Sequence, residues 1–181
     1  MNRGIAKIPY RDTWLNTTDK RDVSPGQVRQ VVAESWQRCR KFGIRPYQNM
    51  TVRVKTQTEM DEIMDKTRSL RAVACPHMER MLQFVQESGL VVVLTDEESC
   101  VVAINGNPET LKEVRAMGFQ IGSVWAENEV GTNAIGTTAL LKQAIQISGT
   151  EHYSAKFHRW TCSAAPILQD NTLKGILGIF G

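Results

Sequence analysis

Two different hydrophobic periodicities divide the chain. Between residues 24 and 89 the apolar side chains recur every three or four positions, which is typical of helices that bury one face. From residue 90 to 181 short runs rich in β-branched residues alternate with turn residues and two short helical patterns, which is typical of a sheet domain. The pattern predicts an α+β fold, in which an antiparallel sheet of five to six strands is flanked by helices, with long helices at the N-terminus.

The N-terminal part is expected to contain a leader and a first helix. Residues 1–23 are polar and basic without a sustained period, so we predict a flexible leader. Ser24 is a favoured N-cap and Pro25 is tolerated in a first helical turn, so a helix is predicted to begin there. Gly43 and Pro46 predict its end.

A second long helical stripe runs from residue 58 to 89. Its apolar positions include several methionines, which fit either a core face or an adaptable interaction surface. Pro76 lies inside the stripe and predicts a kink or a split into two helices. We expect the helices of residues 24–89 to pack on the domain or on a second subunit, and a homodimer is the expected assembly.

The C-terminal part is predicted to supply the sheet over residues 90–181. Apolar runs at residues 90–95 and 100–104 enclose the turn candidate Asp96-Glu97-Glu98-Ser99, which predicts a hairpin. Further strands are predicted at 144–147, 160–168 and 173–180, and short helices at 108–117 and 132–141. Because the last strand reaches the last residue, we expect it to leave an open sheet edge, and we expect the chain to be a fragment of a longer protein.

The segment of residues 125–140 combines an aromatic ring, carboxylates and glycines ahead of an apolar run. Its glycines permit tight backbone geometry, and Thr132 or Asn133 is a candidate N-cap for the helix that follows. Trp125 supplies a large flat surface. The segment predicts the wall of a small pocket, although a tryptophan beside glycines is also a common way to close a core.

Composition narrows the class of protein. The 181 residues are 41% hydrophobic and 23% charged, as in an ordinary globular domain. The net charge of +3 and a pI near 8.7 are weak evidence for nucleic-acid binding, since a dedicated domain usually exceeds a pI of about 9. Four cysteines without a CxxC pair and the lack of an apolar leader favour a cytoplasmic location. No apolar run approaches the roughly 18 residues of a membrane span.

Five motifs carry a family resemblance. They are Ser35-Trp36-Gln37-Arg38-Cys39, Trp125-Ala126-Glu127, Gly131-Thr132-Asn133-Ala134-Ile135-Gly136-Thr137, Glu151-His152-Tyr153 and Trp160-Thr161-Cys162-Ser163-Ala164-Ala165-Pro166-Ile167. In this order and spacing the chain resembles the N-terminal GAF region of bacterial sigma-54-dependent activators of the acetoin-operon and dihydroxyacetone-operon type. It departs from the pattern in the first hairpin, which often carries a glycine near the aspartate.

The resemblance implies a regulatory input domain rather than an enzyme. In the full-length family members an ATPase domain and a helix-turn-helix domain follow, so DNA contact would come only through a domain that this chain lacks. The leading hypothesis is that a small-molecule effector binds the domain, without a cofactor or a metal, and controls the ATPase. The alternative, implied by the dihydroxyacetone branch, is a protein-interaction module that docks a metabolic enzyme subunit without a small ligand.

Five residues are predicted to line or guard the effector pocket: Trp125, Glu127, Asn133, His152 and Trp160. Plainer interpretations also exist, because Glu127 and Asn133 are candidate helix caps, a tryptophan can close a core, and His152 can hydrogen-bond across a strand end. His152, His158 and Cys162 stand in an H-x5-H-x3-C arrangement, but this spacing does not match structural zinc sites, which use four ligands in short pairs. Basic residues of the first helix, such as Arg29 and Arg38, could contact DNA or an acidic partner, but a solvated helix face is the commoner meaning of such charges and is expected here.

Overall fold

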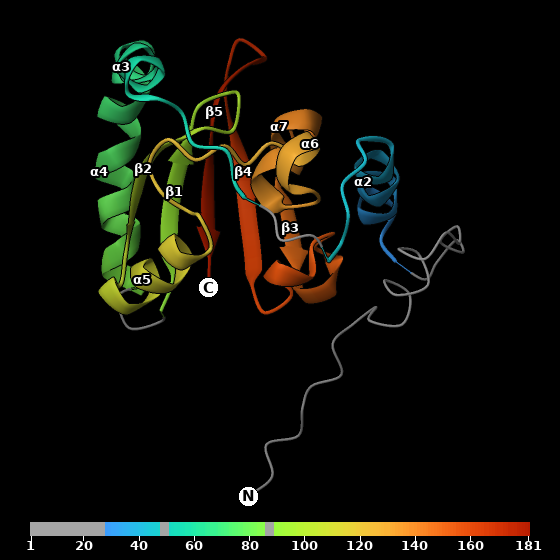
Figure 1. Ribbon diagram of the computed structural model, residues 1–181. Coiled ribbons are helices and arrows are strands. Elements are labelled where there is room, and N and C mark those ends of the chain that lie inside the picture. Colours follow the sequence, from blue (N-terminus) through green and yellow to red (C-terminus); the bar gives the residue numbers. More distant parts are fainter. Residues whose placement is uncertain (1–27, 48–50, 86–88) are drawn as a thin grey trace, which may run out of the picture.

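The computed structural model describes residues 28–47, 51–85 and 89–181 of the chain. The predicted leader at residues 1–23 and the predicted helix start at Ser24 and Pro25 lie outside the described residues. Figure 1 shows one central sheet with helices on both of its faces. The α+β fold with a flanked antiparallel sheet is therefore confirmed.

The sheet has five strands among the described residues, in the order β2-β1-β5-β4-β3. Their bounds are β1 Val91–Thr95, β2 Val101–Gly106, β3 Ile145–Ser148, β4 Thr161–Gln169 and β5 Thr172–Phe180. All neighbouring pairs are antiparallel, and the predicted β1–β2 hairpin is confirmed.

The last strand is not an edge strand, so that expectation was wrong. β5 pairs with β1 on one side and with β4 on the other, which makes it the central strand. Its apolar side chains serve both faces of the sheet, since Ile176 and Phe180 join one core cluster while Leu177 and Ile179 pack against a second. A strand covered on both faces is expected to be continuously apolar, and this explains its sequence.

The β1–β2 and β4–β5 turns contain Asp and Asn residues that suit the geometry of tight turns. Asp96 accepts hydrogen bonds through Oδ1 from the backbone N–H groups of Glu98 (2.9 Å) and Cys100 (2.8 Å), which closes the β1–β2 turn. Asp170 and Asn171 take positive φ angles of 48° and 60° between β4 and β5. Asp and Asn tolerate this left-handed region better than most residues, so they suit a two-residue hairpin turn.

The first described helix, α2 (Gln30–Lys41), has Arg29 at its N-cap position and no side-chain cap. It ends at Phe42, after which Gly43 takes a φ of +75°, so the predicted stop is confirmed. Val32, Trp36 and Cys39 are fully buried on its inner face.

The long helical stripe is divided into α3 (Gln57–Lys66) and α4 (Arg68–Val85), but at Thr67 rather than at Pro76. Thr67 hydrogen-bonds through Oγ1 to the Ile63 carbonyl at 2.7 Å, and such back-bonding competes with the helical ladder. Pro76 stays inside α4, so the predicted split at the proline was wrong.

Short helices complete the fold. Both predicted helices are present, as α5 (Pro108–Ala116) and α7 (Ala134–Leu141). The sequence pattern of residues 150–157 also predicts a helical turn or short helix, and two 3-10 turns lie there, η2 (Gly149–Glu151) and η3 (Ala155–Phe157). The single-turn helix α6 (Glu127–Val130) was not predicted.

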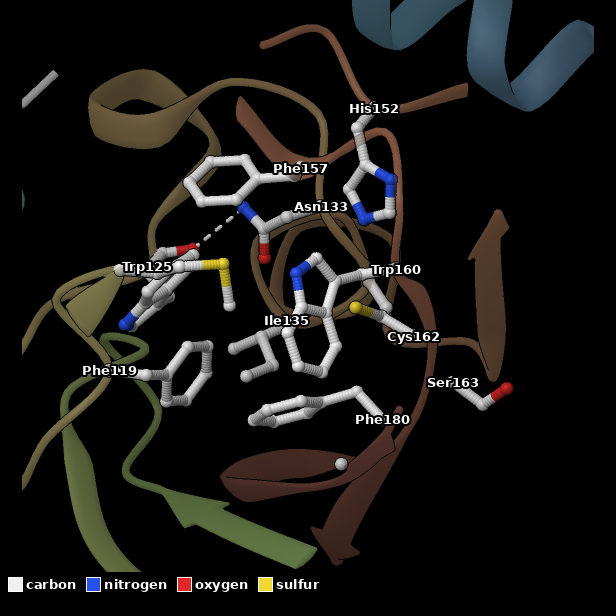
Figure 2. Close-up of a pocket in the computed structure, with 13 residues that line it drawn as sticks. Phe119, Trp125, Asn133, Ile135, His152, Phe157, Trp160, Cys162, Ser163 and Phe180 are labelled. Atoms are coloured by element: carbon white, nitrogen blue, oxygen red, sulfur yellow. Dashed lines mark hydrogen bonds between the residues drawn. The ribbon is translucent and has the colours of Figure 1, made fainter. Parts of the chain in front are cut away.

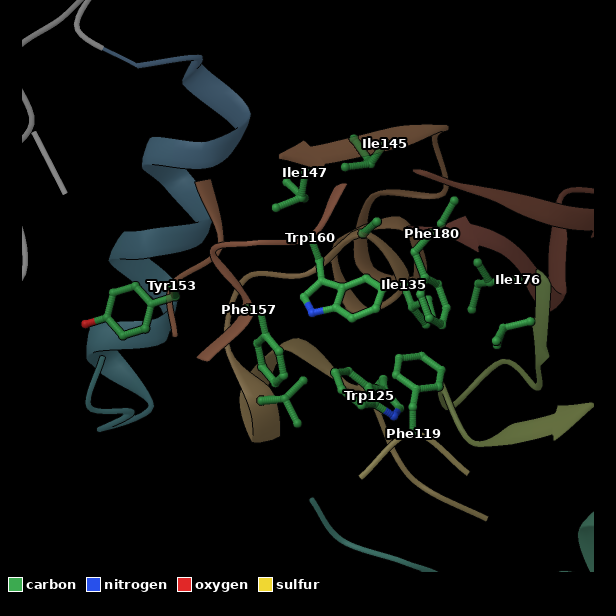
Figure 3. Close-up of a cluster of buried hydrophobic side chains, with 14 of the residues drawn as sticks. Phe119, Trp125, Ile135, Ile145, Ile147, Tyr153, Phe157, Trp160, Ile176 and Phe180 are labelled. Atoms are coloured by element: carbon green, nitrogen blue, oxygen red, sulfur yellow. The ribbon is translucent and has the colours of Figure 1, made fainter. Parts of the chain in front are cut away.

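The core has two main layers, one on each face of the sheet. On one face, Met78 and Leu82 of α4 pack on Val92 and Leu94 of β1. Met78 and the other methionines that pack against this cluster, Met64 and Met81, therefore serve the core. On the other face, α2, α7 and the loops enclose a cluster rich in aromatic rings (Figure 3). This second layer contains the candidate site.

Candidate functional site

A small cavity lies within the aromatic layer. Its walls come from β4, β5, the start of α7, the η2–η3 segment and the loop after α5 (Figure 2). The aromatic rings that line it belong to Phe119, Trp125, Phe157, Trp160 and Phe180. Its free volume is about 30 Å³, which admits a water molecule but not a metabolite without movement of the walls.

Ring contacts hold the wall together. Phe119 stacks on Trp125 with ring centroids 3.9 Å apart, and it lies 4.6 Å from the ring of Phe180. Trp160 meets Phe180 edge-on at 6.3 Å. Offset and edge-to-face arrangements of this kind stabilise aromatic clusters beyond simple burial, so the wall has a defined resting geometry.

His152 contributes a neutral imidazole to the cavity. Burial lowers the pKa of His152 to about 4, because the charged form loses its hydration. Its Nδ1 lies 3.0 Å from the Gly149 carbonyl oxygen, so the neutral ring carries its proton on Nδ1 and donates it there. The other nitrogen, Nε2, is then a hydrogen-bond acceptor.

Two buried ring nitrogens at this cavity lack partners. Within the described residues, neither His152 Nε2 nor Trp160 Nε1 has a hydrogen bond. The two side chains are 1% and 5% exposed, so bulk water does not satisfy them. A neutral imidazole nitrogen accepts and an indole N–H donates, so the cavity presents one acceptor and one donor in an apolar enclosure.

Asn133 lines the cavity, but its amide is fully used to shape the wall. Its Oδ1 accepts from the Gly136 N–H at 2.9 Å, which confirms it as the N-cap of α7. Its Nδ2 donates to the carbonyls of Trp125 (3.0 Å) and Gly131 (2.9 Å). Asn133 therefore fixes the loop that presents Trp125.

Glu127 lies behind the wall rather than in the cavity, which corrects its predicted placement. Its carboxylate accepts from Arg38 Nε at 2.6 Å, from Ser35 Oγ at 2.6 Å and from Thr137 Oγ1 at 2.8 Å. The Glu127 side chain is 4% exposed, and a buried carboxylate needs a cation and hydrogen-bond donors. Helices α2 and α7 supply these groups, whereas an apolar cavity does not.

A second ion pair ties α2 to the other side of the cavity. Arg29 donates to both carboxylate oxygens of Glu151, at 2.7 and 2.6 Å, and Trp36 Nε1 donates to the Glu151 carbonyl at 2.8 Å. Glu151 immediately precedes His152 in the chain. Arg29 remains on the solvated face that was expected, with a 43% exposed side chain, whereas Arg38 is 24% exposed and pairs inward, so the expectation was wrong for Arg38.

The cavity thus brings together four of the predicted residues, namely Trp125, Asn133, His152 and Trp160. The prediction missed other wall residues, namely Met117, Phe119, Ile135, Phe157 and Phe180. The continuous apolar run of β5 was a usable signal that Phe180 is buried, whereas nothing local indicated Phe119, which reaches the cavity from a loop.

Two residues of the H-x5-H-x3-C arrangement, Cys162 and His158, have separate roles in the structure. Cys162 lines the cavity, and burial raises the pKa of its thiol to about 12, so it is protonated at neutral pH. His158 directs Nε2 to the His152 carbonyl at 3.1 Å. In the part of the chain that the structure describes, no group of three or more metal-ligating side chains converges.

The described helices include none with both the length and the apolar character needed to cross a bilayer.

Comparison with known families and proteins places the chain among regulators. The family described as "MimR, N-terminal domain" matches residues 9–181. The acetoin dehydrogenase operon transcriptional activator AcoR of Bacillus subtilis is 36% identical over 92% of the chain and 28% of that protein. The PTS-dependent dihydroxyacetone kinase operon regulatory protein of Escherichia coli is 26% identical over 82% of the chain and 22% of that protein.

The fold also has a solved counterpart. The crystal structure of the Escherichia coli DhaR(N)–DhaL complex aligns with a TM-score of 0.81 and 22% identity, over 84% of the chain and 52% of that chain. At this identity the likeness shows the fold. The chain spans less than a third of the length of the two regulators. The predicted resemblance to acetoin-operon and dihydroxyacetone-operon activators is confirmed.

Proposed function

The chain belongs to the family of MimR N-terminal domains, and from this membership we propose that it is the signal-input domain of a bacterial sigma-54-dependent transcriptional activator. A small metabolite held in the aromatic cavity is the signal. Its binding controls a downstream ATPase in the cytoplasm, and the domain itself has a regulatory rather than a catalytic role.

The observation that carries the proposal is the pair of unpartnered nitrogens, His152 Nε2 and Trp160 Nε1, in an apolar cavity. A buried polar group without a partner costs about 1–3 kcal/mol, so a protein that keeps two of them at one cavity gains from a ligand that satisfies both. A hydroxyl group on a small hydrocarbon frame can donate to His152 Nε2 and accept from Trp160 Nε1, whereas a carbonyl group can only accept from Trp160. A charged ligand is disfavoured, because none of the described residues that line the cavity is charged.

The free volume sets a condition on binding. Since about 30 Å³ holds a water-sized molecule, a metabolite must select a state in which the walls have moved apart. Met117 belongs to the wall and is unbranched, so it can change rotamer at low cost. The cavity walls are joined to α2 through Glu127 and Glu151. We therefore expect α2 to shift when the walls move apart.

A ligand screen by thermal shift tests this function. The probes are short-chain alcohols, ketones and hydroxyketones, with the matching carboxylates as a comparison set. A neutral compound at a hundredfold excess over its Kd should stabilise the fold by about 2.7 kcal/mol. Trp160→Phe keeps an aromatic ring but removes the pyrrole part of the indole with its N–H donor, so it should weaken binding by about tenfold, the equivalent of one hydrogen bond.

Leu168→Ser serves as the control variant, because Leu168 is 45% exposed and lies outside the cavity. It should bind as the wild type does. Failure of every neutral probe, together with a single ordered water bridging His152 and Trp160 in a crystal structure, would remove the reason for a metabolite site.

Protein docking is the second candidate function. The observation that favours it is that a solved structural neighbour is a complex, that of DhaR(N) with DhaL. Native mass spectrometry of the purified chain separates the two candidates, since a small-molecule adduct supports sensing and a stable complex with an added enzyme subunit supports docking. The same measurement tests the proposed homodimer.

A further inference from the structure

A groove of about 370 Å³ is lined by residues of the 125–140 segment other than those that line the aromatic cavity. Its floor is formed by Ala126, Glu127 and Gly136, and we call it the α7 groove. Two bulky apolar side chains flank it, Phe42 at the end of α2 and Leu140 near the end of α7.

The polarity of α7 is inverted relative to an ordinary surface helix. Its two hydroxyl side chains, Thr137 and Thr138, are fully buried, while Leu140 is 54% exposed. A helix without a charged residue along its length is normally covered on all sides. Phe42, from a distant part of the chain, is 52% exposed at the same groove, so the two side chains together form an apolar patch that the core does not use.

The far end of the groove is acidic. Glu97, Glu98 and Ser99 of the β1–β2 turn belong to its lining, and Figure 1 shows this turn at the same end of the sheet as α6 and α7. Lys66 pairs with Glu97 at 2.5 Å, and Lys174 also lies near enough to lower the pKa of Glu97. Glu98 is exposed, and among the described residues no ion pair involves it.

The negative charge of this turn is crowded. Burial raises the pKa of Asp96, and the charges of Glu97 and Glu98 raise it further. A cation placed beside Glu98 would relieve this repulsion. Since the whole chain carries a net charge of +3, a basic partner is attracted to this turn in particular and not to the protein at large.

We propose that the α7 groove is a docking site for a segment of a partner protein that presents an apolar side chain next to an arginine or lysine. The apolar side chain lies between Phe42 and Leu140, and the cation lies at Glu98. This site is separate from the metabolite cavity and does not depend on it. The two sites share the residue 125–140 segment, in which Trp125 and Asn133 line the cavity.

A random peptide library displayed on phage, selected against the full chain, tests the site. Enriched peptides should combine an apolar residue with a neighbouring Arg or Lys, and binding of the synthesised peptides should weaken as salt is added. Leu140→Ser should reduce affinity by about tenfold, in the range of a central apolar contact, and Glu98→Gln by about threefold. Amide chemical shifts should change at Ser99, Asn128 and Leu140.

Leu168→Ser is the matched control, since it removes a leucine of similar exposure, 45% against 54%, at the β4–β5 turn. Trp160→Phe should bind the peptides as the wild type does, so failure of the cavity and failure of the groove remain distinguishable. The proposal is overturned if selection enriches no apolar-basic peptides, if Leu140→Ser and Leu168→Ser act alike, or if the shifts map to another face.

Discussion

Arg38 of α2 and Glu127 of α6 stand 89 residues apart in the chain and form a partly buried ion pair, with Nε 2.6 Å and Nη2 3.1 Å from the two carboxylate oxygens. The Arg38 side chain is 24% exposed and that of Glu127 is 4% exposed. The carboxylate raises the pKa of Arg38 through its hydrogen bond and its charge. This pair joins the first described helix to the loop that presents Trp125.

Glu127→Ala should lower the free energy of unfolding by about 3 kcal/mol, because it leaves the Arg38 charge and two buried hydroxyls without their acceptor. Urea denaturation measures the change. Glu129→Ala is the control, since Glu129 pairs with Arg53 at 2.6 Å in an exposed position and should cost no more than about 1 kcal/mol. Equal losses in the two variants would show that the buried pair has no special role.

Stability should fall as the pH drops from 7 towards 4, because His152 resists protonation in the fold. Its pKa is lowered from 6.5 to about 4, so between these values the unfolded chain takes up a proton that the folded chain does not. The unfolded state then binds more protons, and linkage gives a loss of up to roughly 3 kcal/mol by pH 4. His158 acts in the same direction, since burial lowers its pKa as well.

Urea midpoints at pH 7, 6 and 5 for the wild type and His152→Gln separate this contribution. Glutamine cannot take up a proton, so the variant should lose less stability per pH unit than the wild type does. An identical pH slope in the two proteins would show that His152 is not the group responsible.

Much of the fold could be predicted from sequence because its signals are local. The β1–β2 hairpin, the helix stop at Gly43 and the capping of α7 by Asn133 depend on residue types within a few positions of each other. The central position of β5 could not be predicted in this way. Its place is set by pairing with β1, some eighty residues earlier in the chain, and a strand's own pattern does not identify its partners.

The site was predictable in part for the same reason. Trp125 and Asn133 lie in one glycine-rich segment, and the family resemblance indicated His152 and Trp160. Glu127 was predicted to line the cavity, but the position of a buried carboxylate is set by the cation that pairs with it. That cation, Arg38, comes from α2, which is distant in the sequence. The break at Thr67 was missed because proline is the stronger local signal, although an exposed proline within α4 was tolerated.

Asn133→Ala should destabilise the fold more than the same change at another N-cap. Asn133 satisfies the Gly136 N–H and two carbonyls in a buried loop, so its loss should cost about 2–3 kcal/mol. Asn107 caps α5 at the surface through the N–H groups of Glu109 and Thr110, and Asn107→Ala should cost about 1 kcal/mol. Denaturation midpoints compare the two, and a smaller loss at Asn133 would contradict its role in holding the wall.

Gly136→Ala and Gly178→Ala differ in the space that each glycine leaves for a methyl group. A Cβ at Gly136 would lie 2.4 Å from the Glu127 backbone nitrogen and 2.7 Å from the Trp125 carbonyl oxygen, so the loop and α7 would have to separate. This overpacking should cost about 3 kcal/mol or more. A Cβ at Gly178 meets Ile135 at 3.5 Å, an ordinary contact, so Gly178→Ala should change stability by less than about 1 kcal/mol.

Gly136→Ala therefore tests the packing of the fold, and Gly178→Ala tests ligand binding. Gly178 and Ile135 both line the aromatic cavity, and the added methyl group points toward Ile135, so Gly178→Ala should reduce the space for a metabolite while the fold is kept. Thermal unfolding measures the effect of each variant on stability. Titration with a neutral compound that binds the wild type measures the effect on binding. If Gly178→Ala bound that compound as tightly as the wild type does, the ligand would have to lie elsewhere; if Gly136→Ala folded normally, the close contact of α7 with the Trp125 loop would not be needed.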